Sequence, residues 1–232
     1  MRSYIVTGAT GDLGQAVVGG LLAAGHRVAA PYRSIERFEE LQASLPGNDV
    51  ERLWGDAAEL TDLTQMRAFV EAAVQECEKI DGLASLAGAY AGSGTLERTP
   101  DDEWDEMQGA NLRTAWVASR AVLPFLLEGG GSVVTVSAGL VEAGGAGAAA
   151  YAVSKAGVEA LTRALALENR DRGVRFNCVA PLIIDTPGNR AAMPEANRAS
   201  WTPPERLANL IGFLLSPDSA PLSGARLPVR GR

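Results

Sequence analysis

Cysteine and histidine are scarce in this sequence, which has two cysteines and one histidine among 232 residues. Cys77 and Cys178 lie far apart within apolar segments, so we expect buried, reduced thiols rather than a disulfide or a metal framework. His26 is expected at the solvent end of a helix-to-strand turn, outside any catalytic role. The scarcity of ligating side chains predicts no metal site, and reduced thiols favour a cytoplasmic location.

A basic surface and long apolar runs are missing as well. The formal net charge is −7, which leaves no basic face for phosphate backbones and argues against nucleic acid or an anionic membrane as a partner. Glycine or charged residues interrupt every apolar run before it could span a bilayer, and we find no charged leader followed by an apolar core. We therefore expect a protein that acts on a small molecule, without a membrane partner.

Short apolar runs alternate with helical patterns along the whole chain. The strand candidates are "YIVTG" (4–8), "RVAAPY" (27–32), "VERLWGD" (50–56), "GLASLAG" (82–88), "SVVTVSA" (132–138) and "VRFNCVAP" (174–181). Apolar residues three and four apart predict helices in 13–25, 60–79, 100–129 and 151–173. This alternation predicts one α/β domain over 1–232, with a doubly wound parallel sheet covered by helices on both faces. The Pro-rich stretch 186–210 is predicted to be a loop with a short helix, forming a substrate lid over about 186–205.

Three glycines punctuate the stretch "YIVTGATGDLGQAVV" at three-residue intervals. Gly8, Gly11 and Gly14 follow the first predicted strand and open the first predicted helix. Glycine at such a turn lets a pyrophosphate approach the backbone N–H groups and the positive end of the helix dipole. We expect a dinucleotide site here, although glycines at this turn can also serve backbone geometry alone.

Several motifs occur in one order along the chain. They are "TGATGDLG" (7–14), "LAGAYAG" (86–92), Asn111, "GSVVTVSAG" (131–139), "YAVSK" (151–155), "VAPLIIDTP" (179–187) and "LSGARLPVRG" (222–231). In order and spacing this set resembles the short-chain dehydrogenase/reductase family over nearly the whole chain. The resemblance implies a Rossmann-type fold, a nicotinamide cofactor and hydride transfer.

Tyr151 and Lys155 are the predicted acid/base pair. They are four residues apart on a predicted helix and therefore share a face, where an ammonium is expected to lower the pKa of a neighbouring phenol. A neutral tyrosine protonates a ketone oxygen during reduction, and tyrosinate reverses the step. The resemblance also implies that Lys155 binds the nicotinamide ribose and that Asn111 holds a water in a proton relay. The alternatives are an exposed Tyr–Lys pair and a surface asparagine.

The cofactor is predicted to be NADP(H), with NAD as the alternative. No carboxylate follows the second predicted strand, where Tyr32, Arg33 and Ser34 stand, and Arg33 can pair with a 2′-phosphate. The resemblance places Asp56 at the adenine edge, with Glu59 as a rival. The cofactor-binding set that it implies is Gly8, Thr10, Gly11, Asp12, Leu13, Gly14, Arg33, Ser34, Asp56, Ala87, Gly88, Tyr151, Lys155, Pro181, Ile184 and Thr186.

Three positions depart from the family pattern. Ala138 stands where the family has its substrate-orienting serine, and Leu86 and Leu182 replace an asparagine and a glycine. Ser137 is one residue earlier, so strand alternation predicts that its side chain points away from the substrate. A missing oxyanion donor predicts slow reduction of plain ketones.

The departures leave the substrate and even the activity open. The run at 183–205 is similar to dihydropteridine reductase, whose quinonoid substrate needs less help from such a donor, whereas Asn111 and the tail resemble ketone and 3-oxoacyl reductases. A catalytically weakened NADP(H)-binding regulator or scaffold is the second hypothesis. Met193 and Trp201 are expected either to line the substrate pocket or to pack on the core.

The helices that carry Asn111 and Tyr151 have apolar residues beyond a single stripe. We expect these residues to pair copies of the chain into a homodimer or homotetramer, as the resemblance implies. They are Trp116, Val117, Leu123, Val158, Leu161 and Leu165.

Overall fold

Seven parallel strands form the centre of the computed structural model, which describes residues 1–231. The strands are β1 (Ser3–Thr7), β2 (Arg27–Tyr32), β3 (Leu53–Ala57), β4 (Gly82–Ser85), β5 (Gly131–Val136), β6 (Val174–Pro181) and β7 (Arg226–Val229). Their order across the sheet is β3-β2-β1-β4-β5-β6-β7, and every neighbouring pair is parallel. The predicted single α/β domain with a doubly wound parallel sheet is confirmed.

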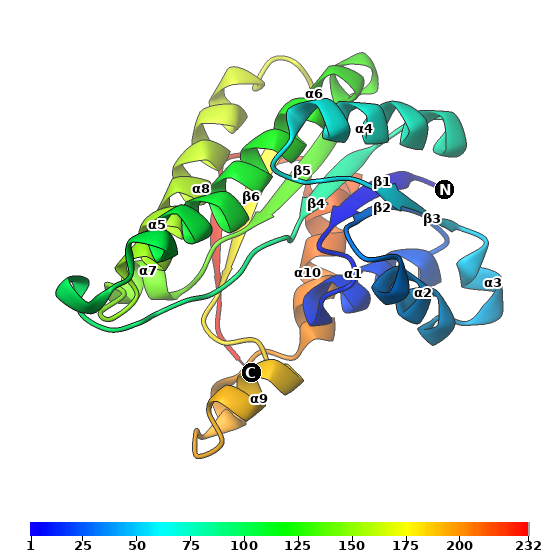
Figure 1. Cartoon of the computed structure of the whole chain (residues 1–232). Helices are drawn as coiled ribbons and strands as arrows, with labels where there is room; N and C mark the ends of the chain where they lie inside the picture. Colours follow the sequence, from blue (N-terminus) through cyan, green and yellow to red (C-terminus); the bar gives the residue numbers. More distant parts are fainter. Residues whose placement is uncertain (232) are drawn as a thin grey trace.

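Helices cover both faces of the sheet (Figure 1). They are α1 (Asp12–Ala23), α2 (Ile35–Ser44), α3 (Gly47–Val50), α4 (Leu63–Cys77), α5 (Asp101–Met107), α6 (Thr114–Gly129), α7 (Leu140–Ala143), α8 (Ala149–Glu168), α9 (Pro187–Ala192) and α10 (Pro204–Leu215). Helices α1 and α10 pack together on one face, and α4, α6 and α8 lie on the other. Among the described residues, none of the helices combines the length and apolar character needed to cross a membrane.

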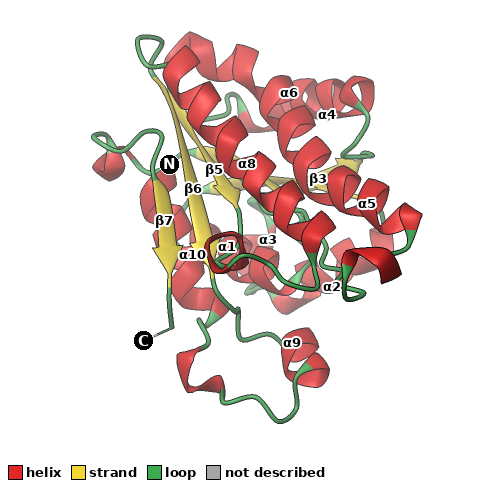
Figure 2. Cartoon of the chain, turned by 90° about the vertical axis from the view of Figure 1, so that its left-hand side faces the viewer, coloured by secondary structure: helices red, strands yellow, loops and turns green. Residues whose placement is uncertain are grey.

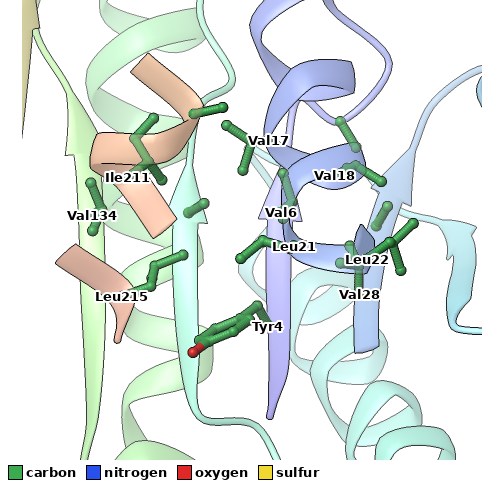
Figure 3. Close-up of a cluster of buried hydrophobic side chains, with 14 of the residues drawn as sticks. Tyr4, Val6, Val17, Val18, Leu21, Leu22, Val28, Val134, Ile211 and Leu215 are labelled. Atoms are coloured by element: carbon green, nitrogen blue, oxygen red, sulfur yellow. The ribbon is translucent and has the colours of Figure 1, made fainter. Parts of the chain in front are cut away.

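Alternation along the strands divides the core into two layers. Val6 of β1 lies beside Val17 and Leu21 of α1, and Ile211 of α10 lies beside Val134 of β5 in the same layer (Figure 3), whereas Ile5 faces the opposite layer. Adjacent side chains of a strand point to opposite faces of the sheet. The sequence of a strand that is buried on both faces is therefore a continuous apolar run. Burial of each such aliphatic side chain stabilises the fold by about 1.5–3 kcal/mol.

Four helices (α2, α3, α7 and α10) and strand β7 are absent from the sequence-based prediction. The stretch 186–210 holds the short helix α9, as expected, but its last part begins the 12-residue helix α10 and is not a loop. Pro204 lies in the first turn of α10, where the missing N–H costs nothing, and Leu207, Ile211 and Leu214 form the buried stripe. Helix α2 is short and buries only Phe38 and Leu41, and β7 is a short edge strand.

The order of the strands reverses between β1 and β4. The chain passes from β1 outward to β3 and then returns to β4 on the other side of β1. In such sheets ligands bind beyond the carboxyl ends of the strands at this reversal. Helix α9 also lies beyond the carboxyl ends of β6 and β7 (Figure 2), so the segment 186–205 is on the same side of the sheet as the expected site.

Candidate active site

The turn between β1 and α1 contains the three evenly spaced glycines. A Cβ at Gly14 would lie 2.0 Å from the carbonyl oxygen of Gly8, and a Cβ at Gly8 would lie 2.8 Å from the backbone nitrogen of Ala87. Gly8 also has a φ of +70°, a conformation that favours glycine. Only Gly11 has ordinary space around it, with its nearest contact at 3.5 Å. The protein's own packing therefore requires glycine at positions 8 and 14, whereas Gly11 has space beside it. The dinucleotide site at this turn stays a prediction.

A cleft of about 930 Å³ extends from this turn along the carboxyl ends of the strands. Gly11 is the N-cap of α1 and offers no capping side chain, so the N–H groups of the first helical turn remain available to an anion. The predicted cofactor residues that line the cleft are Gly8, Thr10, Gly11, Asp12, Leu13, Gly14, Arg33, Ser34, Ala87, Gly88 and Thr186.

The end of β2 contributes two arginines to the cleft. Arg33 is exposed and forms no ion pair within residues 1–231. Arg37, in the first turn of α2, also lines the cleft. The sequence analysis did not include it among the cofactor residues, although its i, i+4 spacing from Arg33 could have indicated that the two side chains lie close together. The hydroxyl of Ser34 caps α2 by accepting from the Arg37 N–H (3.3 Å) and donates to Glu36 Oε2 (2.6 Å).

Asp56 and Glu59 are the two candidates for the adenine edge. Asp56 is not among the lining residues, and its Oδ1 accepts from the backbone N–H of Ala57 (2.8 Å). Glu59 does line the cleft, and its Oε1 accepts from both the N–H and the hydroxyl of Thr61 (3.2 and 3.0 Å). Of the two candidates, Glu59 lines the cleft and Asp56, near the end of β3, does not.

Asn111, Lys155 and Gly88 come together at the nicotinamide end expected for the cleft. A Cβ at Gly88 would lie 2.6 Å from Asn111 Oδ1 and 3.1 Å from Lys155 Nζ. Asn111 is 1% exposed, and Lys155 is 6% exposed with Nζ donating to the carbonyl of Val136 (3.0 Å). Burial excludes the alternative of a solvated surface pair or a surface asparagine. Asn111 occupies a π-helical turn at Gln108–Arg113, a geometry that is frequent at functional sites.

The Asn111 amide connects two segments of the site. Its Oδ1 accepts from the N–H of Ala89 (3.0 Å), and its Nδ2 donates to the Ala89 carbonyl (3.1 Å) and to Ser154 Oγ (3.1 Å). Asn111 therefore links the loop after β4 to helix α8, where its partner Ser154 lies between Tyr151 and Lys155 in the sequence. This contact orients the loop that borders the cleft.

The predicted effect of Lys155 on Tyr151 is not met. Burial raises the pKa of Tyr151 to about 12, and the nearby Tyr90 raises it further, whereas burial lowers the pKa of Lys155 to about 8. The Lys155 Nζ is 5.9 Å from the centre of the Tyr151 ring and is hydrogen-bonded to Val136 instead. Removal from water outweighs the attraction of the two groups because it penalises the charged form of both.

Ser137 cannot replace the serine that Ala138 lacks. Its side chain is 2% exposed, and Oγ lies 2.7 Å from Glu159 Oε1 and 3.1 Å from the Lys155 carbonyl, both of which accept from it. The predicted orientation away from the site is confirmed. Arg226 also donates to Glu159 Oε1 (2.7 Å). Ser137 therefore belongs to a hydrogen-bond network that connects the end of β5 with α8 and β7.

The segment after β6 closes on itself. Thr202 N–H donates to Ile183 O and Asp185 N–H donates to Thr202 O, both at 2.9 Å, so 186–201 forms a loop with fastened ends. Trp201 is 4% exposed and packs inward, which favours the core alternative over a pocket-lining role. Among the other predicted residues of this region, Thr186 lines the cleft and caps α9, whereas Pro181 and Ile184 do not line it. Met193 is half-buried.

Sequence comparison identifies the family to which this arrangement belongs. The profile of the short chain dehydrogenase family matches residues 2–197. The chain belongs to the short chain dehydrogenases. It is 31% identical to a 2-(R)-hydroxypropyl-CoM dehydrogenase from Xanthobacter autotrophicus (99% of this chain, 97% of that protein) and 32% identical to a 3-oxoacyl-acyl-carrier-protein reductase from Pseudomonas aeruginosa (98% and 95%).

Solved structures agree with this assignment. An NADPH-bound short chain oxidoreductase from Pseudomonas aeruginosa, described as containing an atypical catalytic center, has a TM-score of 0.90 and 27% identity, covering 98% of this chain and 95% of that one. This short chain dehydrogenase is accordingly an NAD(P)-dependent oxidoreductase. Across residues 1–231 no group of three or more His, Cys, Asp or Glu side chains could hold a metal ion.

Proposed function

We propose that the protein is an NADP(H)-dependent oxidoreductase that transfers hydride between the nicotinamide and a small carbonyl or quinonoid substrate. The observation that carries the proposal is the buried cluster of Asn111, Lys155 and Gly88, next to Tyr151 and at the end of a cleft. The cleft, of about 930 Å³, matches the size of small-molecule and cofactor sites. The glycine turn, Arg33, Arg37 and Thr186 would hold the cofactor, which supplies or accepts the hydride when bound.

Tyr151 would exchange the proton. With a pKa of about 12 its phenol is protonated at neutral pH and can therefore donate to a carbonyl oxygen during reduction. Lys155, with a pKa of about 8, is mostly charged at neutral pH and would stabilise the tyrosinate that remains. Asn111 would hold the relay water and the loop after β4.

NADP(H) is favoured over NAD(H) by the charges at the end of β2. Two guanidinium groups, Arg33 and Arg37, line this end of the cleft, and a 2′-phosphate can pair with either of them. Arg33→Ala should weaken NADPH binding about tenfold or more and leave NADH binding unchanged. Equal loss for both nucleotides, measured by calorimetry, would contradict the preference.

The substrate is proposed as a ketone, a 3-oxoacyl compound or a pteridine-like quinonoid ring. The relative that reduces 3-oxoacyl-acyl-carrier-protein supports the second class. The third class rests on our interpretation that 183–205 resembles dihydropteridine reductase, which stays a prediction, and on Ala138, which stands where the family has a serine. The segment 186–205, fastened by Thr202, would act as the substrate lid.

Turnover with a panel of these three substrate classes tests the proposal. The wild type should oxidise NADPH with at least one of them, and Tyr151→Phe should lower kcat by about 10²–10⁴-fold while NADPH binding persists. Unchanged kcat in Tyr151→Phe would overturn the mechanism.

A second function is supported by the departures in the catalytic half. With Ala138 in place of the serine, and Leu86 and Leu182 in place of an asparagine and a glycine, the protein would bind NADP(H) as a regulator or scaffold without turnover. Tight NADPH binding without reduction of any panel compound would favour this function.

Assembly into a homodimer or homotetramer through α6 and α8 is also proposed. Trp116 on α6 and Val153 on α8 are large exposed apolar side chains, whereas Val117 and Val158 are fully buried inside the chain and cannot contribute as expected. Light scattering at micromolar concentration tests this; a monomer would overturn it.

A further inference from the structure

A second tyrosine lies against Tyr151. Tyr90 belongs to the loop after β4, and the two ring centres are 4.9 Å apart with an interplanar angle of 74°, an edge-on contact. Tyr90 is 65% exposed, and within residues 1–231 its hydroxyl makes no hydrogen bond. An exposed aromatic residue beside the half-buried phenol of Tyr151 is available to a substrate that approaches that phenol.

The other hydroxyl groups around Tyr151 are engaged. Ser137 Oγ faces Glu159, and Ser154 Oγ donates to the Tyr151 carbonyl (2.8 Å) and accepts from Asn111. Ser93, on the same loop as Tyr90, donates to Glu103. Ala138 supplies no hydroxyl. Tyr90, whose ring contacts Tyr151, therefore has a hydroxyl that is free to donate to a substrate oxygen.

The loop makes room for the Tyr90 ring. A Cβ at Gly92 would lie 2.7 Å from the Tyr90 hydroxyl and 3.1 Å from Ala148 Cβ. A side chain at position 92 would therefore displace the tyrosine. The hydroxyl of Tyr90 is also close enough to Tyr151 to raise the pKa of Tyr151, so the two hydroxyl groups interact electrostatically.

We propose that the Tyr90 hydroxyl donates a hydrogen bond to the substrate carbonyl oxygen, in the position of the donor that Ala138 lacks. This inference rests on the proposed function. During reduction the C=O bond gains a hydride at carbon from the reduced nicotinamide and a proton at oxygen from Tyr151. Tyr90 keeps its own proton and stabilises the negative charge that develops on oxygen.

Tyr90→Phe tests this directly because it keeps the ring and removes only the hydroxyl. We expect kcat to fall about 10²-fold, the low end of the range for loss of one oxyanion donor, with the dissociation constant for NADPH unchanged. Ala138→Ser in the Tyr90→Phe background should restore at least tenfold of the loss. Ser93→Ala is the matched control on the same loop and should retain wild-type kcat. Wild-type kcat in Tyr90→Phe, or a change confined to KM, would overturn the proposal.

A spectroscopic readout separates this proposal from the proposed function. The titration of Tyr151 is obtained as the difference in tyrosinate absorption between a protein and its Tyr151→Phe variant, and loss of the Tyr90 hydroxyl should lower the pKa of Tyr151 in this difference. If Tyr151→Phe abolishes turnover while Tyr90→Phe retains wild-type kcat and leaves the pKa of Tyr151 unchanged, only the Tyr90 proposal fails. If Tyr151→Phe itself retains turnover, the proposed function fails as well.

Discussion

The two halves of the cleft depend on different parts of the chain. The half at β1–β3 is built on backbone geometry, because Gly8 and Gly14 permit approaches of 2.8 and 2.0 Å that a Cβ would block. The half at β4–β7 is built on side chains: Tyr151, Lys155 and Asn111 are present, but Ala138 has replaced a serine. A cofactor site made of backbone constrains the fold itself, whereas a catalytic site made of side chains can lose one member without disturbing the sheet.

Gly14→Ala should show the largest effect, because it attacks the half that is built on backbone. The new Cβ would meet the Gly8 oxygen and the Ala9 backbone at 2.0 and 2.7 Å, and neither can move without breaking the turn. We expect a loss of about 3 kcal/mol in the free energy of unfolding and no measurable NADPH binding.

Gly11→Ala is the matched control for Gly14→Ala. Its Cβ would meet only the Gly8 oxygen, at 3.5 Å, which is ordinary contact, so stability to urea should stay within about 0.5 kcal/mol of wild type. NADPH binding should nevertheless weaken, because Gly11 faces the cleft. Equal destabilisation by the two variants would contradict the assignment of Gly14 to packing and of Gly11 to ligand space.

Lys155→Met tests the half that is built on side chains, through the pH dependence of stability. The pKa of Lys155 is about 8 in the folded chain against an ordinary 10.5, so between these values the unfolded chain binds more protons and the free energy of unfolding rises with pH. The cost, about 3 kcal/mol, is fully present below pH 8 and relieved by about pH 10.5. The pKa of Tyr151, about 12, is raised, so above its ordinary 10 the stability falls again.

Lys155→Met should abolish the rise between pH 8 and 10.5. At pH 7 the variant should be at least as stable as wild type, although the Val136 carbonyl loses its donor and offsets part of the gain. Urea unfolding at several pH values measures this. If the free energies of unfolding of the two proteins changed with pH in parallel, the charged form of Lys155 would not destabilise the fold.

Period and spacing in the sequence were sufficient for one group of predictions. The alternation of runs predicted the parallel sheet, i, i+4 spacing placed Tyr151 and Lys155 on one face, and strand alternation predicted the orientation of Ser137. These features depend on local geometry, which the sequence encodes directly.

The features that the sequence did not predict depend on contacts between residues that are far apart in the sequence. The neighbour that constrains Gly8 is Ala87, and the pKa of Tyr151 is raised by burial and by Tyr90, which lies on another segment. The choice between Asp56 and Glu59 depends on where β3 ends in space. Helix α10 was a different error, since Leu207, Ile211 and Leu214 form a readable stripe that the prolines before it obscured.

Ser34→Ala should give a smaller effect than Gly14→Ala or Lys155→Met, and it tests whether a residue of the cofactor half acts through the fold instead. The Ser34 hydroxyl accepts from Arg37 N–H and donates to Glu36, so loss of this N-cap should cost about 1 kcal/mol of stability. Because the hydroxyl is already engaged, NADPH affinity should change less than in Arg33→Ala. Stability to urea and calorimetric NADPH binding measure the two effects. An unchanged unfolding free energy with a large loss of affinity would assign Ser34 to the cofactor, and the cap would then be incidental.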